Sequence, residues 1–149
     1  MIAGRLGYLR RRNEERALFL RAAVSLAVCR LSLKVLSFDS TRRLLRLISW
    51  PRSSQEQTDG DALINVQWAV RAAGRRLPWA VTCLTKAICT QALSDRFGEP
   101  TSLKLGVARD DVGELKAHAW VESRGRVISG AMSELPEFTL LTTFAGDAV

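Results

Sequence analysis

Cys83 and His118 are of the two residue types that together catalyse acyl transfer through a covalent intermediate. A cysteine thiolate attacks a carbonyl carbon, while an imidazole takes the thiol proton and later passes it to the leaving group. His118 is the single histidine among 149 residues, so a metal site rich in histidine is excluded. The pair therefore indicates cysteine-dependent acyl chemistry rather than metal chemistry.

Cys83 stands where a helix is expected to begin. Residues 83–97 carry only three charged side chains, which predicts a helix that is buried on most sides. Thr82 is suited to cap this helix, so Cys83 falls in the first turn. The unpaired N–H groups and the helix dipole favour negative charge there, which stabilises a thiolate and can stabilise an oxyanion. The alternative is that Cys83 is one more small apolar core residue.

His118 lies in a segment where apolar and polar residues alternate, which predicts a strand over 117–122. It is expected on the same face of this strand as Trp120 and Glu122. A cysteine that opens a helix, followed by a histidine on a strand, is the arrangement of Cys–His acyl transfer. The spacing of 35 residues is far shorter than the ~130–150 of papain, so the layout of papain itself is excluded. The alternative is a histidine held by a backbone partner.

The other two cysteines are expected in the core. Cys89 follows Cys83 by six residues, about 600° of helix, so the two side chains face different directions and cannot share a metal or a disulfide. Cys29 falls within the apolar pattern of the first helix. An odd count of three cysteines fits a reducing compartment, so we expect a cytoplasmic protein.

The elements that must position these residues are helices first and strands later. Apolar residues at helical spacing predict a helix over 14–36 whose covered stripe is Leu20, Val24, Val28, Leu31 and Val35. Further helices are predicted over 41–49, with Ser40 as cap and Arg42 outside, and over 62–73, with Asp61 as cap and Gly74 as stop.

After Pro100 the hydrophobic period changes from that of a helix to that of a strand. Alternation predicts strands over 103–107, 117–122, 126–129 and 138–143. The sequence therefore predicts an α+β fold, in which N-terminal helices precede a central buried helix that packs on an antiparallel sheet.

Charge and composition limit the class of protein. Residues 1–52 hold 12 Lys and Arg against 3 Asp and Glu, whereas residues 53–149 hold 10 against 12. The polar segment 52–60 is the expected linker between an N-terminal helical subdomain, 1–52, and a catalytic core, 53–149. No uncharged stretch reaches the ~18–20 residues that span a bilayer. No nucleic-acid motif accompanies the basic charge, so nucleic acid is not an expected partner.

Several blocks of the sequence together resemble a known family. The blocks are 76–79, 83–87, 103–107, 117–122 and 125–127. In this order and spacing they resemble the leader peptidases of lasso-peptide biosynthesis, which are bacterial transglutaminase-like cysteine peptidases related to the microcin-processing protein. The resemblance is close over residues 60–142 and looser before them.

This resemblance implies a role for each residue of the pair. Cys83 would be the nucleophile and His118 the base, and these steps need neither a metal nor an organic cofactor. The substrate would be a lasso precursor peptide, bound with the help of a separate leader-binding recognition protein. A lasso cyclase resembling asparagine synthetase would then close the ring. Candidate docking aromatics are Trp50, Trp68 and Trp79.

The resemblance also implies an acidic residue that holds the imidazole, on the strand after His118. Its expected place, 129–131, holds Ser-Gly-Ala. Glu134 is the nearest downstream carboxylate, and Asp110 or Asp111 are candidates from the preceding turn. Glu122 is excluded, because it lies four strand residues, about 13 Å, from His118.

Two alternative functions stay open from the sequence. The same pair of side chains would serve an acyltransferase that passes the acyl group to an amine instead of water, as transglutaminases do. Without an acidic third member, the chain would instead be a non-catalytic module that presents the precursor.

Overall fold

The computed structural model describes residues 2–48, 61–133 and 135–146. Four helices come first and four strands follow, which confirms the predicted α+β class. The elements are α1 (Ile2–Val35), α2 (Phe38–Ile48), α3 (Asp61–Arg76), α4 (Cys83–Arg96), β1 (Ser102–Arg109), β2 (Leu115–Ser123), β3 (Arg126–Ser129), the 3₁₀ turn η1 (Leu135–Glu137) and β4 (Thr139–Ala145). Within the described residues, none of the helices combines the length and the apolarity needed to cross a bilayer.

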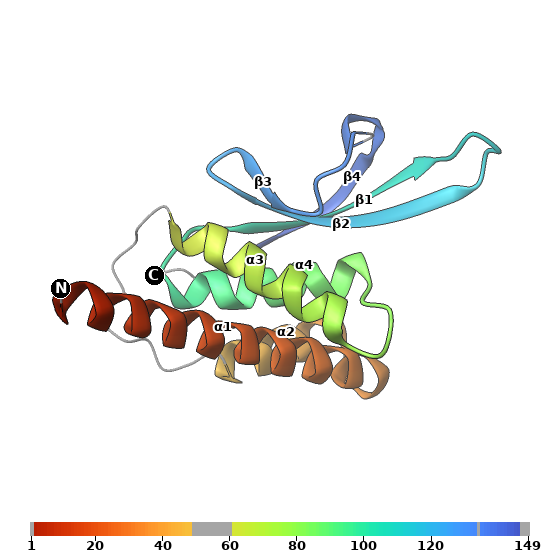
Figure 1. The fold of residues 1–149 in the computed structure, drawn as a ribbon. Coiled ribbons are helices and arrows are strands. Elements are labelled where there is room, and N and C mark those ends of the chain that lie inside the picture. The colour runs from red at the N-terminus through yellow and green to blue at the C-terminus, as the bar shows by residue number, and fades with distance from the viewer. Residues whose placement is uncertain (1, 49–60, 134, 147–149) are drawn as a thin grey trace.

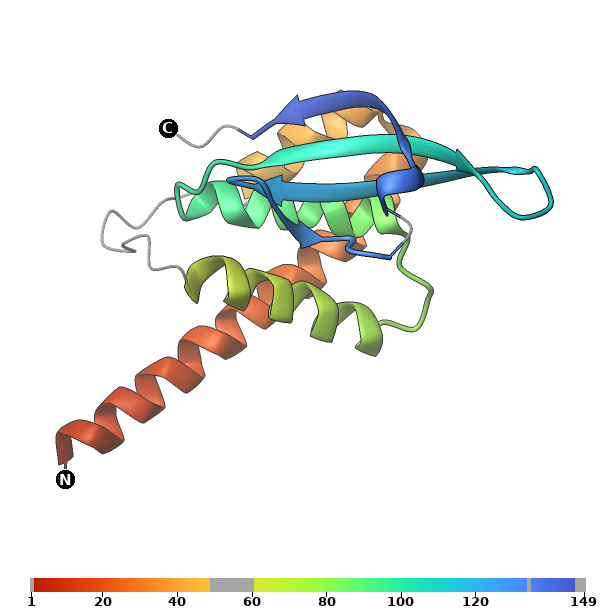
Figure 2. The same ribbon diagram turned by 90° about the horizontal axis from the view of Figure 1, so that it is seen from above.

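Helix α4 lies at the centre of the molecule. It contacts β2 on one side and α1 and α2 on the other, while α3 runs beside it (Figure 1). Seen from above, the sheet covers α4, and the β1–β2 hairpin extends past the helices (Figure 2). The prediction of a central buried helix on a sheet is therefore confirmed.

The sheet has the strand order β3-β2-β1-β4, and every neighbouring pair is antiparallel. Gly106 of β1 lies opposite His118 of β2, and Leu103 lies opposite Val121. Because side chains alternate along a strand, Leu103, Ala119 and Val121 share the face buried in the core. His118 is on the opposite face of β2, together with Trp120 and Glu122, as its position predicted.

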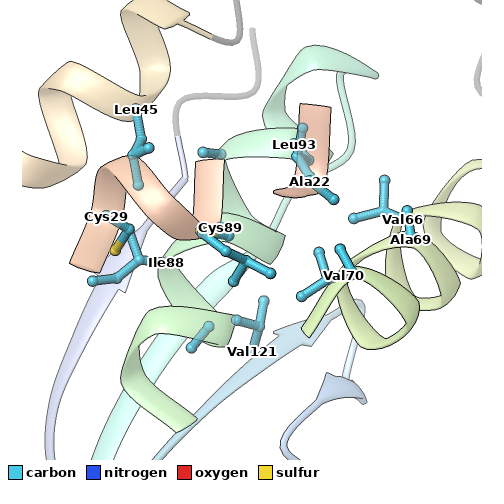
Figure 3. Packing of buried hydrophobic residues seen from close by; sticks show 14 of the residues in the cluster. Ala22, Cys29, Leu45, Val66, Ala69, Val70, Ile88, Cys89, Leu93 and Val121 are labelled. Atoms are coloured by element: carbon cyan, nitrogen blue, oxygen red, sulfur yellow. The ribbon is translucent and has the colours of Figure 1, made fainter. Parts of the chain in front are cut away.

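One hydrophobic core joins the helices to the sheet (Figure 3). Leu26 of α1, Leu45 of α2, Ile88 of α4 and Val121 of β2 are almost completely buried in it. The first two helices thus pack on the same core as the later elements. The proposed division into 1–52 and 53–149 stays a prediction, and the expected linker over 52–60 lies outside the described residues.

The predicted covered stripe of the first helix is wrong. Leu20, Leu31 and Val35 are 62%, 64% and 80% exposed, whereas Ala22 and Cys29 are fully buried. Apolar residues occur on more than one face of this helix, so their spacing does not tell which face is covered. Small side chains allow close contact with α3 and α4, and the face that carries them is buried.

Three predicted helix ends also differ from the structure. The first helix was predicted to begin at residue 14, but α1 begins at Ile2. The N–H of Ser40 donates to Ser37 Oγ (3.3 Å), so α2 begins three residues earlier and Ser37 is its cap. Helix α3 does not stop at Gly74 but continues to Arg76. A glycine inside a helix costs only about 1 kcal/mol, and the buried face of α3 on the core offsets it.

Arg42 was expected on the outer face of α2, and this is wrong. It is half-buried and donates hydrogen bonds to Gln91 Oε1 (2.9 Å) and to the carbonyl oxygen of Ala145 (3.1 Å). Its guanidinium also lies 4.9 Å from the ring centroid of Phe144. Arg42 therefore joins α2, α4 and β4, because a guanidinium can satisfy several acceptors at once.

Candidate active site

Cys83 is the first residue of α4, as predicted. Thr82 is the cap: its Oγ1 accepts a hydrogen bond from the N–H of Thr85 (3.2 Å). The N–H of Lys86 donates to the carbonyl oxygen of Thr82 and begins the helical ladder. Capping in this way leaves the N–H groups of Cys83 and Leu84 without an intrahelical acceptor. The half-buried thiol thus lies beside two backbone donors at the positive end of the helix dipole.

His118 is held by the backbone of Gly130, the residue that directly follows β3. Its Nε2 lies 2.7 Å from the carbonyl oxygen of Gly130. A carbonyl oxygen can only accept, so Nε2 carries the hydrogen of this bond. In the neutral ring the other nitrogen, Nδ1, then has the free lone pair and is the basic atom.

One cavity brings Cys83 and His118 together. It has a volume of about 280 Å³ and opens between α3, the start of α4 and the β2–β3 edge of the sheet. The polar and charged residues around it include Gln67, Arg71, Cys83, Lys86, Thr90, His118 and Ser129. The two residues that the sequence singled out, 35 positions apart, therefore line the same cavity.

Aromatic rings fix the orientation of His118 on its strand. The ring centroids of His118 and Trp120 are 6.1 Å apart, and the two ring planes are nearly parallel. The ring centroid of Phe138 lies 5.6 Å from that of His118. Trp120 in turn packs directly over Gly106, where an added Cβ would lie 2.9 Å from its ring. The glycine opposite His118 thus makes room for the indole that supports the imidazole.

Glu122 holds this aromatic support in place rather than the imidazole itself. Its carboxylate accepts a hydrogen bond from Trp120 Nε1 (2.9 Å) and pairs with Lys104 Nζ (2.6 Å). The hydrogen bonds from Lys104 and Trp120 lower the pKa of Glu122 below its ordinary value. The carboxylate is therefore two contacts away from His118, in agreement with the sequence-based exclusion of a direct role.

The candidates for an acidic third member do not approach His118 in the described residues. Asp110 Oδ1 accepts from the N–H groups of Val112 and Glu114 within its own turn, and Asp111 is exposed there. Glu134 lies outside the described residues. The acceptor on the ring is instead the Gly130 backbone, at the place where an acidic side chain was expected. The sequence offered a backbone partner for His118 only as the alternative to a catalytic role, and it could not tell which residue supplies it, because a carbonyl belongs to every residue type.

The fold requires glycine at position 130. Its φ is +81°, and an added Cβ would lie 2.7 Å from the carbonyl oxygen of Ala119 and 3.0 Å from Trp120 Cβ. Residues with a side chain rarely adopt this backbone conformation, and the space is filled. The Gly130 carbonyl is thus directed at His118 by a local conformation that other residue types would strain.

Cys29 and Cys89 are both fully buried, which confirms their prediction as core residues. Burial raises the pKa of the Cys89 thiol well above its ordinary value. Neither residue lines the cavity that Cys83 lines. In the part of the chain that the structure describes, no group of three or more His, Cys, Asp or Glu is placed to hold a metal ion.

Comparison with known proteins agrees with this architecture. The family model of the transglutaminase-like superfamily matches residues 23–143, which include α2 to β3 entirely, α1 from residue 23 onward and most of β4. Searches of curated proteins and of solved structures returned no match. The family model spans more than half of the sequence, and the chain therefore belongs to the transglutaminase-like superfamily.

Proposed function

We propose that this protein is a cysteine peptidase that removes the leader from a ribosomally made lasso-peptide precursor. Membership in the transglutaminase-like superfamily, which includes cysteine peptidases, supports the chemistry. The blocks 76–79, 83–87 and 117–122, which resemble lasso-peptide leader peptidases, support the substrate. The observation that carries the proposal is the cavity shared by a helix-opening thiol and an imidazole whose Nε2 is held by a backbone carbonyl.

The reaction begins with proton transfer from the Cys83 thiol to His118. Nδ1 is the basic atom of the ring, because Nε2 donates to Gly130. The thiolate then attacks the carbonyl carbon of the scissile peptide bond, and a C–S bond forms. The imidazolium gives its proton to the departing amine, so the C–N bond breaks and a thioester remains on Cys83.

Hydrolysis of the thioester completes the cycle. His118 takes a proton from water, the resulting hydroxide attacks the thioester carbon, and the Cys83 thiolate leaves with a proton from His118. In both halves of the reaction a negative charge develops on the carbonyl oxygen. The N–H groups of Cys83 and Leu84 at the start of α4 are the donors that would stabilise it.

The partners and the setting belong to the same proposal. The precursor would be presented by a separate leader-binding recognition protein, and an asparagine synthetase-like cyclase would use the released core peptide. Trp68 is a candidate for docking, because it is 49% exposed and lies beside Phe19 on the face between α1 and α3. Trp79 is half-buried under Arg30, and Trp50 lies outside the described residues. Three free cysteines support a cytoplasmic setting.

The test is cleavage of the precursor by the full chain, with and without the recognition protein, followed by mass spectrometry. Removal of a nucleophile costs on the order of 10⁶ in kcat, and removal of a general base about 10²–10⁴. We therefore expect Cys83→Ala to release no leader and His118→Ala to release very little. Cys89→Ala is the matched control, because it removes a thiol from the same helix outside the cavity.

The products also separate the alternatives. A precursor joined to an added amine would mean that the acyl group goes to an amine, as in a transglutaminase. Normal processing by Cys83→Ala, with its circular dichroism spectrum unchanged, would contradict the proposal and leave a module that presents the precursor without cutting it.

A further inference from the structure

We infer that the cavity beside Cys83 selects substrates with an acidic side chain close to the scissile bond, and that Lys86 and Arg71 recognise this side chain. The inference rests on the proposed peptidase function and names a substrate feature for it. It is carried by the charge of the cavity wall and by the way Lys86 is held.

The charged side chains around the cavity are of one sign. Lys86 comes from α4 and Arg71 from α3, while no residue among the described lining is Asp or Glu. Within the described chain, neither cation has an ion-pair partner. A cleft with charges of one sign raises the local concentration of a ligand of the opposite sign. A carboxylate is the anionic group that a peptide substrate carries.

Lys86 is placed to act next to the reacting sulfur. It follows Cys83 by three residues, so the two side chains lie on the same face of α4. Its stem packs across α3, where a Cβ on Gly74 would lie 3.7 Å from Lys86 Cε. The half-buried stem restricts the ammonium to the neighbourhood of the cavity, so less order is lost when it binds a carboxylate.

The first experiment compares cleavage of paired precursors that carry Asp or Asn at single positions on either side of the cut. We expect wild-type kcat/KM to favour Asp over Asn about tenfold at one position at least. The preference should fall toward one in the double variant Lys86→Gln, Arg71→Gln. Lys116→Gln is the matched control, because this exposed lysine of β2 lies outside the cavity lining. Equal rates for Asp and Asn at every position would overturn the inference.

A second experiment needs no peptidase activity. Iodoacetate and iodoacetamide both alkylate a thiolate, but only iodoacetate carries a carboxylate. We expect the iodoacetate to iodoacetamide rate ratio at Cys83 to fall several-fold in the double variant and to stay unchanged in Lys116→Gln. High salt should lower the wild-type ratio, because it screens the cations. An equal ratio in wild type and double variant would contradict a carboxylate-binding cavity.

The two experiments fail in different ways. Absence of cleavage for every precursor, with the alkylation ratio changed by the double variant, would overturn the peptidase function and uphold carboxylate binding beside Cys83. Cleavage with no charge preference and no change in the ratio would overturn the inference alone and leave the peptidase proposal in place.

Discussion

Two cysteines of α4, six residues apart, lie in opposite environments. Cys83 is the first residue of the helix, half-buried, and lines a cavity with His118. Cys89 is in the middle of the same helix, fully buried in the core near Cys29 (Figure 3). The residue type is the same, so the difference comes from the position along the helix and from what packs around it.

The two positions differ in their electrostatic surroundings. At the start of α4, unpaired N–H groups and the positive end of the helix dipole lie beside Cys83. In the middle of the helix the backbone N–H groups donate to carbonyl oxygens of the preceding turn. Burial there raises the pKa of the Cys89 thiol. A nucleophile is therefore expected at one end of this helix and an inert packing residue at its centre.

The largest expected contrast is in thiol reactivity. Iodoacetamide should modify Cys83 in the native protein at least about 10³ times faster than Cys29 or Cys89, which react only when the core opens. Peptide mapping after timed alkylation measures the three rates. In denaturant the three rates should become similar. Comparable native rates would show that the cysteines do not differ as described.

Gly130→Ala tests whether the activity of Cys83 at the start of α4 depends on the hydrogen bond between Gly130 and His118. The added Cβ would meet the Ala119 carbonyl oxygen, so the backbone must shift and the hydrogen bond to His118 weakens. We expect kcat of leader removal to fall about 10–100-fold, as for loss of a group that orients a catalytic residue. Gly113→Ala is the matched control: its φ is also positive, at +82°, and an added Cβ there meets no atom within 4 Å. An equal loss in both variants would assign the effect to general backbone strain.

Cys89→Ser tests whether the buried cysteine in the middle of α4 has a packing role only. A hydroxyl that replaces this fully buried thiol has only the weakly hydrogen-bonding Cys29 thiol as a side-chain partner, so the free energy of unfolding should fall by about 1–3 kcal/mol. Urea denaturation measures this change. Cys83→Ser should change stability less, because Cys83 is only half-buried. Activity per folded Cys89→Ser molecule should stay near that of the wild type, and a loss comparable to that of Cys83→Ala would contradict a packing role.

The smallest expected effect concerns the outer face of the sheet. The pKa of Glu122 is lower in the folded chain than its ordinary value of 4.5, so the unfolded chain binds this proton more readily. The stability that Glu122 provides is therefore present above about pH 4.5 and is lost as the pH falls through the lowered folded-state value. Urea unfolding of wild type and Glu122→Gln between pH 6 and 3 measures it. The difference between the two proteins should shrink on acidification, and a constant difference would contradict the linkage.

Much of the fold follows from local patterns in the sequence. The change from helical to alternating spacing after Pro100 predicted the order of helices and strands, and Thr82 predicted the start of α4. These features depend on neighbours within a few residues, which the sequence displays directly. The errors lie where local patterns are ambiguous, such as the covered face of α1 and the inward position of Arg42.

In the candidate site, too, one part could be predicted from the sequence and another could not. Cys83 and His118 were recognisable by residue type, because a chain with one histidine offers one candidate imidazole. Their third partner was not recognisable, because the group that binds His118 is the backbone carbonyl of Gly130. Side-chain chemistry can be seen in a sequence, whereas the direction of a carbonyl is set by φ and ψ and by packing.

The sequence by itself thus determined which residues can do chemistry, which helix presents the thiol, and which strand carries the imidazole. Only the tertiary structure decided that both residues line one cavity, that the charged side chains of this cavity are cationic, and that a carbonyl oxygen holds the imidazole. The physical reason is the distance along the chain over which each effect acts. Propensity and periodicity act over a few residues, whereas a cavity forms only when α3, α4 and the sheet pack together.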